Sequence, residues 1–295
     1  MRFLVCFALA LLLIDTGFHL EAVMACEKVL SEVEERSLIR THGVKLNVDD
    51  MDQALSFYQG KLGFEIEDRS GYPNQVVLKS GDSNKLILFK VKKLRKAEIG
   101  DTGVSFTLQV NDLDQASSAM RSRGVEFAET EKRKEGVGFA IYIRDPFGRR
   151  ISLMHQTIVK VEPFQEPKIY NYGFAIPDMG VGRDFYSNKL GFVVRSERYL
   201  PLDLPLGHKD KSFAFMLHYR PGIKPIKSSY PSPAPFYTIV FETDSLEAAI
   251  AELKKRGVKI LSRRPQQGAE GNYVAFEDPF GNVSELLEVK SSKAT

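Results

Sequence analysis

One carboxylate has a sequence environment suited to catalysis. Glu285 lies in the largely apolar segment SELLEV, and burial raises the pKa of a carboxyl group, so this residue could act as a general base. The histidines give no comparable signal, because His155, His208 and His218 lack the spacing of metal ligands. No nucleophile elbow, glycine-rich phosphate loop or Ser–His pairing accompanies them. The chemistry of Glu285 therefore depends on how its strand and the neighbouring strands are arranged.

The elements around that strand are duplicated. The segment DMDQALSFYQGKLGF at 50–64 returns as DMGVGRDFYSNKLGF at 178–192. In the first copy Asp50 can cap a helix, apolar residues recur at spacings of three and four, and Gly63 can end the helix. The pattern predicts one short amphipathic helix in each copy.

Strand-forming segments flank each predicted helix. The segment GVKLNV (43–48) alternates in polarity before the first helix, and three β-rich runs follow it. The same order begins again after residue 100 and twice more in the second half, which predicts four β-α-β-β-β units in an α+β fold. The DPFG segments at 145–148 and 278–281 place Asp, Pro and Gly where a type I turn needs them.

These motifs resemble those of the vicinal oxygen chelate superfamily, which includes glyoxalases, fosfomycin and bleomycin resistance proteins and extradiol dioxygenases. The resemblance rests on the four units, on the AxxFYxxxLGF-like helix ends at 54–64 and 182–192, and on DPFGRRISLM (145–154) and DPFGNVSELL (278–287). It implies tandem domains, each built of two βαβββ units forming a cupped mixed sheet. Members of the family have many chemistries or none, so the resemblance implies a fold rather than one activity.

The predicted organisation follows from the repeat. The segment 157–167 contains two prolines, which resist a continuous helix, so it is the predicted linker between the two repeats. A second irregular segment, 220–235, contains five prolines and is either disordered or a functional lid. The predicted parts are a signal peptide (1–22), a tether (23–39), a glyoxalase-like domain one (40–156), a linker (157–167), a glyoxalase-like domain two (168–290) and a tail (291–295).

The N-terminal segment predicts export, to a secreted or periplasmic location. Arg2 precedes the apolar run FLVCFALALLLI, which is shorter than the roughly 20 residues of a membrane span. Cleavage after Ala22 is one expectation, and a lipid anchor on Cys26 is the alternative. A buried or poorly ordered N-terminal segment is the third.

Composition narrows the range of partners. The chain is 43% hydrophobic and 27% charged, as in ordinary globular proteins. Its net charge of +3 is scattered, which argues against nucleic acid as a partner. Cys6 lies in the predicted signal peptide, so no intramolecular disulfide is expected after cleavage.

The resemblance also implies metal positions in each cup, usually occupied by His, His and Glu. Glycine, serine and threonine are poor ligands, so no metal or other cofactor is expected in domain one. In domain two, Glu285 with Asn171 could hold a divalent metal, but a hydrogen-bonded strand glutamate is the favoured reading. The matching residues are Gly43, Ser105 and Ser152 in domain one and Asn171, Thr238 and Glu285 in domain two.

His42 lies next to one of these positions. Side chains alternate along a strand, so if Gly43 faces the cup, His42 points with Val44 and Leu46 toward the helices. A strand-end irregularity could turn His42 toward the cup instead, but the expected result is a half-exposed structural histidine.

The predicted linings of the two cups supply the candidate ligand-binding residues. The cup of domain one is expected to be polar and cationic without carboxylates, which favours an anionic or amide-rich ligand. The alternative is that Lys45 and Arg150 extend to solvent at the rim. The candidates are Lys45, Asn47, Gln109, Arg150, Ser152, Asn171 and Thr238.

Three functions are compatible with these residues. The first is metal-free binding of a small molecule in a cup, the second is a metal-dependent lyase or dioxygenase that uses Glu285, and the third is an exported scaffold for oligomer contacts. The missing ligand side chains favour the first or third. Whether the domains pair within one chain or between chains, and the oligomeric state, stay open.

Overall fold

The computed structural model describes residues 38–80, 84–94, 103–158, 167–210, 212–226, 230 and 234–290. Several predictions lie outside these residues: the signal peptide 1–22, the lipid anchor at Cys26 and the tail 291–295. Most of the predicted tether and of the predicted linker also lies outside them.

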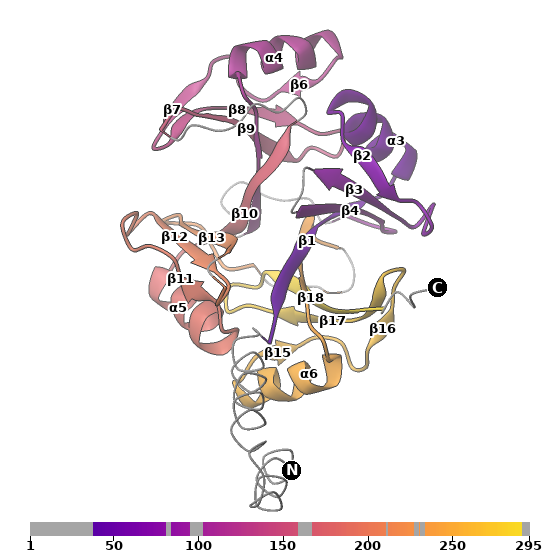
Figure 1. The fold of residues 1–295 in the computed structure, drawn as a ribbon, viewed down its shortest axis with the longest axis vertical. Helices are drawn as coiled ribbons and strands as arrows, with labels where there is room; N and C mark the ends of the chain where they lie inside the picture. The colour runs from indigo at the N-terminus through magenta and orange to yellow at the C-terminus, as the bar shows by residue number, and fades with distance from the viewer. Residues whose placement is uncertain are drawn as a thin grey trace, which may run out of the picture.

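The predicted order of elements is present in the first half of the chain, with one short strand more than predicted in unit two (Figure 1). Each unit begins with a long strand and a helix, and further strands follow. Unit one comprises β1 (Arg40–Val48), α3 (Met51–Leu55), η1 (Ser56–Lys61), β2 (Glu65–Asp68), β3 (Gln75–Ser80) and β4 (Asn84–Lys90). Unit two comprises β5 (Gly103–Gln109), α4 (Leu113–Ser122), β6 (Glu126–Phe127), β7 (Arg133–Glu135), β8 (Gly138–Arg144) and β9 (Arg150–Gln156).

The second half repeats this order, which confirms the duplication. Unit three comprises β10 (Lys168–Ile176), α5 (Met179–Arg183), η2 (Asp184–Lys189), β11 (Val193–Val194), β12 (Asp203–Gly207) and β13 (Phe213–Tyr219). Unit four comprises β14 (Tyr237–Glu242), α6 (Leu246–Lys255), β15 (Lys259–Ile260), β16 (Gln266–Gln267), β17 (Gly271–Glu277) and β18 (Val283–Val289).

The helices of units one and three begin as α-helices and end as π-helical segments, η1 and η2. Asp50 and Asp178 cap them as predicted, each accepting a hydrogen bond of 2.9 Å from the backbone N–H three residues later. In η1 the Leu62 N–H donates to the Phe57 carbonyl, five residues back, at 2.9 Å. Gly63 follows with φ +87°, as expected for a residue that ends a helix.

The four units pair crosswise into two mixed sheets. Unit one joins unit four in the order β15-β17-β18-β14-β1-β4-β3-β2, and unit two joins unit three in the order β11-β12-β13-β10-β5-β9-β8-β6. The central strands are antiparallel, so we call these the β1/β14 sheet and the β5/β10 sheet. Each sequence repeat therefore contributes half of each sheet, and the pairing occurs within one chain.

Two buried Tyr–Asp hydrogen bonds link the two sheets, one donated from the helix of each sheet. Tyr58 in η1 donates to Asp145 in the DPFG turn between β8 and β9, and Tyr186 in η2 donates to Asp278 in the turn between β17 and β18; both bonds are 2.8 Å long. In each turn the N–H of the glycine donates to the aspartate carbonyl, at 3.0 and 3.1 Å. This is the turn hydrogen bond that the DPFG motif predicts.

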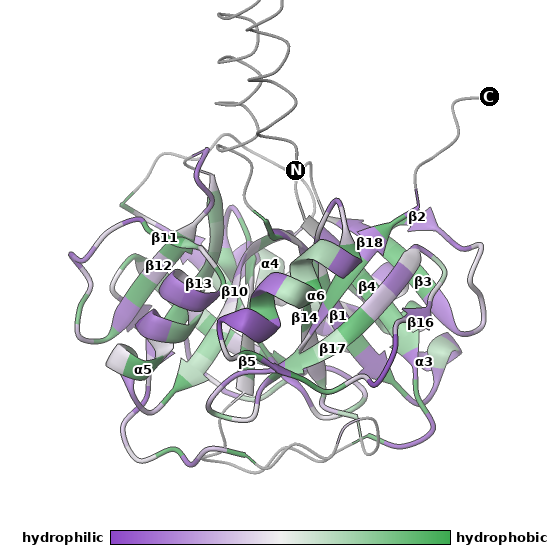
Figure 2. Cartoon of the chain, turned by 90° about the horizontal axis from the view of Figure 1, so that it is seen from below, coloured by the Kyte–Doolittle hydropathy of each residue, from purple (hydrophilic) through white to green (hydrophobic). Residues whose placement is uncertain are grey.

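Apolar side chains pack the helices onto the sheets and the sheets onto each other. Phe192, which follows η2, lies 4.9 Å from Phe215 on β13 and 5.4 Å from Phe241 on β14, measured between ring centres. The most hydrophobic segments are strands (Figure 2). No helix in the described part of the chain is both long and apolar enough to cross a membrane.

Candidate functional site

Four of the predicted site residues meet on one face of the β1/β14 sheet. Lys45 and Asn47 lie on β1, Thr238 on β14 and Glu285 on β18. Lys45 pairs with Thr238, and Glu285 pairs with Val240, two residues further along β14. Because side chains alternate along strands, these residues share a face. The crosswise pairing thus brings the two ends of the described chain into one cup.

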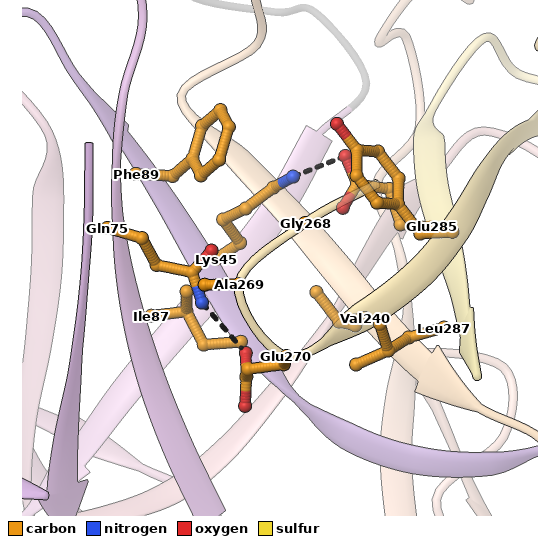
Figure 3. Close-up of a pocket in the computed structure, with 11 residues that line it drawn as sticks. Lys45, Gln75, Ile87, Phe89, Val240, Gly268, Ala269, Glu270, Glu285 and Leu287 are labelled. Atoms are coloured by element: carbon orange, nitrogen blue, oxygen red, sulfur yellow. Dashed lines mark hydrogen bonds and ion pairs between the residues drawn. The ribbon is translucent and has the colours of Figure 1, made fainter. Parts of the chain in front are cut away.

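Lys45 and Glu285 form a buried ion pair in this cup (Figure 3). The Lys45 Nζ donates to Glu285 Oε1, and the two side chains are only 7% and 10% exposed. The same Nζ lies 4.5 Å from the ring centre of Phe89 and 5.4 Å from that of Tyr273. A buried ion pair is often less stabilising than well-packed apolar residues of similar volume. The pair is therefore better explained by function than by stability.

Asn47 holds the edge of the cup. Its Nδ2 donates to the Pro235 carbonyl at 2.7 Å and to Thr238 Oγ1 at 3.3 Å. Both amide hydrogens are therefore used within the protein. The backbone carbonyl of Asn47 accepts a hydrogen bond from the Arg149 guanidinium. Asn47 thus positions the end of β1 and the segment that leads into β14.

A small, partly open cavity lies beside the ion pair. Its volume is about 30 Å³, which is room for a water-sized molecule. Its wall includes Gln75, Phe89 and Tyr273, which the sequence analysis did not select, and the loop 268–270 between β16 and β17 (Figure 3). No motif marks these residues, because only the pairing of unit one with unit four brings them to Lys45. Access for a larger molecule requires the loop or the side chains to move.

His42 lies against this loop, so the prediction of a half-exposed histidine pointing toward the helices is wrong. Its Nδ1 lies 2.8 Å from Glu242 Oε2, its Nε2 lies 3.0 Å from Glu270 Oε1, and its side chain is 4% exposed. The physical reason is a β-bulge in β1 between residues 41 and 43, which breaks the alternation of side chains.

The two glutamates make His42 a cation. Burial disfavours its charge, but the hydrogen bonds to Glu242 and Glu270 outweigh burial and raise the pKa of His42 to about 9. Glu270 also accepts a hydrogen bond from Gln75 Nε2 at 3.0 Å. His42 on β1 and Gln75 on β3 thereby hold the loop 268–270 across the cup.

The other predicted ligand-binding residues lie in the β5/β10 sheet. Ser152 on β9 and Asn171 on β10 both pair with Thr107 on β5. The Oδ1 atom of Asn171 is buried without a hydrogen-bond partner. Gln109 is half-buried at the end of β5. This row of residues is neutral, with amide and hydroxyl groups.

Arg150 does not join Lys45 in one cationic cup, so that prediction is wrong. The two residues lie in different sheets, and each is paired with a carboxylate: Arg150 Nη2 donates to Glu129 Oε1 at 2.9 Å, and Lys45 donates to Glu285. Arg150 is exposed, whereas Lys45 is buried. The order of the repeats suggested that units one and two share a cup, and the crosswise pairing separates them.

The donors of the β1/β14 cup do not fit the metal that the family resemblance implies. Of the six implied positions, this sheet contains Gly43, Thr238 and Glu285. A Cβ at position 43 would lie 2.4 Å from the Lys85 carbonyl oxygen, so a ligand side chain is not accommodated there. The one carboxylate at these implied positions, Glu285, is bonded to the Lys45 ammonium, whose charge opposes a second cation.

The donors of the β5/β10 sheet are also poor. Ser152 and Asn171 are neutral, and the side chain of Ser105 lies outside the described residues. Across the described ranges, no group of three or more His, Cys, Asp or Glu residues is arranged to hold a metal ion.

Known proteins share this architecture. Glyoxalase I from Zea mays has a TM-score of 0.63 and 18% identity, covering 85% of this chain and 92% of that chain. A putative dioxygenase from Bacillus subtilis has a TM-score of 0.59 and 12% identity, covering 86% of each chain. At these identities the likeness shows the fold alone.

Sequence comparison extends the match. The uncharacterized protein YaeR of Escherichia coli (strain K12) is 26% identical over 127 residues, which is 41% of this chain and 95% of YaeR. The model of the Glyoxalase/Bleomycin resistance protein/Dioxygenase superfamily matches residues 40–153 and 168–286. These regions coincide with the two sequence repeats, so the chain belongs to this superfamily, as a tandem member with two vicinal oxygen chelate regions.

Proposed function

We propose that this protein binds a small molecule in the cup of the β1/β14 sheet without a metal. The buried Lys45–Glu285 pair is the observation that carries the proposal, because it places two charges at a cavity where apolar residues would pack more stably. Membership of the superfamily supports small-molecule binding as the general activity.

Entry of the ligand involves the loop 268–270. The volume of the cavity, about 30 Å³, is far below the roughly 300–1,000 Å³ of typical ligand pockets. Glu270 fastens the loop to His42 and Gln75 on one side, and Lys290 Nζ donates to the Gly268 and Ala269 carbonyls at 3.3 and 3.1 Å on the other. Pro235, the last residue of the proline-rich segment 220–235, accepts the Asn47 hydrogen bond at the edge of the cup, and residues 227–229 and 231–233 lie outside the described ranges.

An enzymatic role for Glu285 has less support. Its Oε1 atom accepts the hydrogen bond from Lys45, so only Oε2 could take a proton from a substrate while the ion pair stays intact. A metal-dependent lyase or dioxygenase would need a donor set that this cup lacks.

Mass spectrometry of the purified protein tests the proposal. Native spectra should show a co-purifying small molecule that is released on denaturation and is lost in the double variant Lys45→Met/Glu285→Leu. The variant Lys132→Met, which removes a lysine from an exposed ion pair with Asp114, should retain the molecule. Stoichiometric zinc, nickel, manganese or iron that survives brief chelation and disappears in Glu285→Ala would instead establish a metalloenzyme.

Export is part of the same proposal. It is supported by Arg2 and the apolar run at 3–14, which have the pattern of a signal peptide. The intact mass of the protein from its native host should correspond to loss of residues 1–22, or to a lipid-modified chain that begins at Cys26. A mass that retains residues 1–22 would contradict export by this signal.

A further inference from the structure

The cavity of the β1/β14 sheet is lined by the buried Lys45–Glu285 pair and by Glu270, whose carboxylate is paired with His42. Lys45 and Glu285 bond to each other with side-chain exposures of 7% and 10%. Removing the partner of a buried charge is strongly unfavourable. A ligand that separates this pair must therefore replace the charge that each group loses.

Singly charged ligands do not meet this condition. An anion bound to Lys45 leaves the Glu285 carboxylate buried without a cation, and a cation bound to Glu285 leaves the Lys45 ammonium without an anion. A neutral apolar ligand keeps the pair but gains no charge-assisted hydrogen bond from it. A short zwitterion meets the condition, because its anionic end replaces Glu285 at Lys45 and its cationic end replaces Lys45 at Glu285.

We propose that this cup binds a short zwitterion of the α-amino acid class, an inference that rests on the proposed function. The Lys45 Nζ and Glu285 Oε1 are direct hydrogen-bond partners, so the two ligand charges must be close together, as in an α-amino acid. Tyr273 lies on β17 two residues from Ala275, which pairs with Glu285, so its ring lies on the same face. A ligand ammonium at Glu285 would gain a cation–π contact with this ring.

The rest of the cavity wall defines the substituent. Ile87, Val240 and Leu287 form an apolar wall between the ion pair and Glu270 (Figure 3). Glu270 itself is already paired with His42. An aliphatic side chain therefore fits this wall better than a polar one.

Isothermal titration calorimetry with four matched compounds tests the inference. Leucine is the zwitterion, 4-methylpentanoate lacks its ammonium, 3-methylbutylamine lacks its carboxylate, and 4-methylpentanamide is neutral. Leucine should bind the wild-type protein at least about tenfold more tightly than each of the other three, a difference that calorimetry resolves readily.

Single variants should change the preferred charge. Glu285→Gln leaves Lys45 unpaired, so 4-methylpentanoate should become the tightest ligand. Lys45→Met leaves Glu285 unpaired, so 3-methylbutylamine should become the tightest ligand of that variant. The matched controls Lys132→Met and Glu252→Gln remove charges from surface ion pairs and should keep the wild-type order. If a single variant does not fold, the apolar double variant Lys45→Met/Glu285→Leu provides a packed cup that should lose the preference for leucine.

Each outcome has a distinct meaning. Tighter binding of 4-methylpentanamide, or of either singly charged compound, to the wild type would overturn the zwitterion inference and leave small-molecule binding intact. Binding of none of the four would also overturn it, while the co-purifying molecule decides the proposed function separately. Unchanged ligand order in both single variants would show that the ion pair does not select the ligand.

Discussion

The two DPFG turns have the same backbone and tyrosine hydrogen bonds to the aspartate, but the side chain that follows the turn and bonds to this aspartate differs. In both turns the carboxylate accepts hydrogen bonds from a tyrosine hydroxyl and from the backbone N–H groups two and four residues later. In the first turn Arg149 Nη1 also donates to Asp145 at 2.6 Å, whereas in the second Asn282 Nδ2 donates to Asp278 at 2.8 Å. One buried carboxylate therefore has a cation beside it, and in the described part of the chain the donors to the other are all neutral.

This difference between the two turns also affects the β1/β14 cup. The guanidinium of Arg149 also donates to the carbonyls of Asn47 and Phe236, so it ties the first turn to the central strands of the β1/β14 sheet. Among the described residues Asn282 makes no such link, and the backbone of Ile226 lies over the second turn instead, donating to the Phe280 carbonyl at 2.9 Å. Both turns have the same backbone hydrogen bond, and the first turn also supports the strand that carries Lys45.

Replacement of Arg149 by methionine should cause the largest loss of stability. The change removes the cation from the buried Asp145 carboxylate and the donor from the carbonyls of Asn47, in β1, and Phe236, just before β14. Breaking a buried ion pair in this way costs about 3–5 kcal/mol. Urea unfolding at neutral pH should show this decrease in the free energy of unfolding.

The neighbouring Arg150 provides the control for this experiment. Its ion pair with Glu129 is exposed, so Arg150→Met should change the free energy of unfolding by less than about 1 kcal/mol. If Arg149→Met costs no more than Arg150→Met, the charge in the first turn is not needed and the contrast between the turns is incidental.

The second turn should make stability depend on pH. Burial raises the pKa of Asp278 from 3.8 to about 6, despite the hydrogen bonds from Asn282 and Tyr186. The folded protein thus holds the proton of the Asp278 carboxyl group more tightly than the unfolded chain does. The stabilisation that this proton gives to the folded state is therefore complete below pH 3.8 and is lost as the pH rises through about 6. The shift corresponds to about 3 kcal/mol.

The variant Asp278→Asn measures this dependence, because its side chain does not titrate. The free energy of unfolding of the wild type, minus that of the variant, should fall as the pH rises from 3.8 to about 6. A difference that stays constant over this range would show that Asp278 has an ordinary pKa.

Asn282→Ala should have a smaller effect than Arg149→Met. It removes one donor from Asp278 but leaves the Tyr186 hydroxyl and two backbone N–H groups in place. A hydrogen bond to a charged group contributes about 2 kcal/mol, which is the expected loss above pH 7. Because this hydrogen bond lowers the pKa of Asp278, an NMR titration of its carboxyl carbon should show a higher pKa in the variant. An unchanged pKa would contradict the role of Asn282.

The local elements of this fold could be predicted because each depends on a short motif. The caps at Asp50 and Asp178 and the two DPFG turns need only a few adjacent residues, and all four are present as expected. The repeat then predicts the four units, since near-identical motifs form similar structure. Four of the site residues could be selected for a related reason, because alternation along β1, β14 and β18 decides which side chains face the cup.

The arrangement of the site could not be predicted in this way. Lys45 and Glu285 are 240 residues apart, and a repeat pattern does not tell which units share a sheet. The β-bulge beside His42 has no sequence signal, yet one extra residue reverses the face on which a side chain lies. Gln75, Phe89 and Tyr273 resemble ordinary strand residues until the pairing places them around Lys45.

The smallest expected effect gives the sharpest comparison of the two turns. Tyr58 and Tyr186 each donate one hydrogen bond of 2.8 Å to the turn aspartate, so Tyr58→Phe and Tyr186→Phe remove the same bond from carboxylates with different partners. Asp145 keeps the Arg149 cation, whereas Asp278 keeps only neutral donors. Above pH 7 we therefore expect Tyr186→Phe to lower the free energy of unfolding by about 1.5 kcal/mol and Tyr58→Phe by about 0.5 kcal/mol. The pKa of Asp278 should also rise in Tyr186→Phe, because the tyrosine hydrogen bond lowers it. Equal losses in the two variants, measured by urea unfolding, would show that Arg149 does not compensate for the missing hydroxyl.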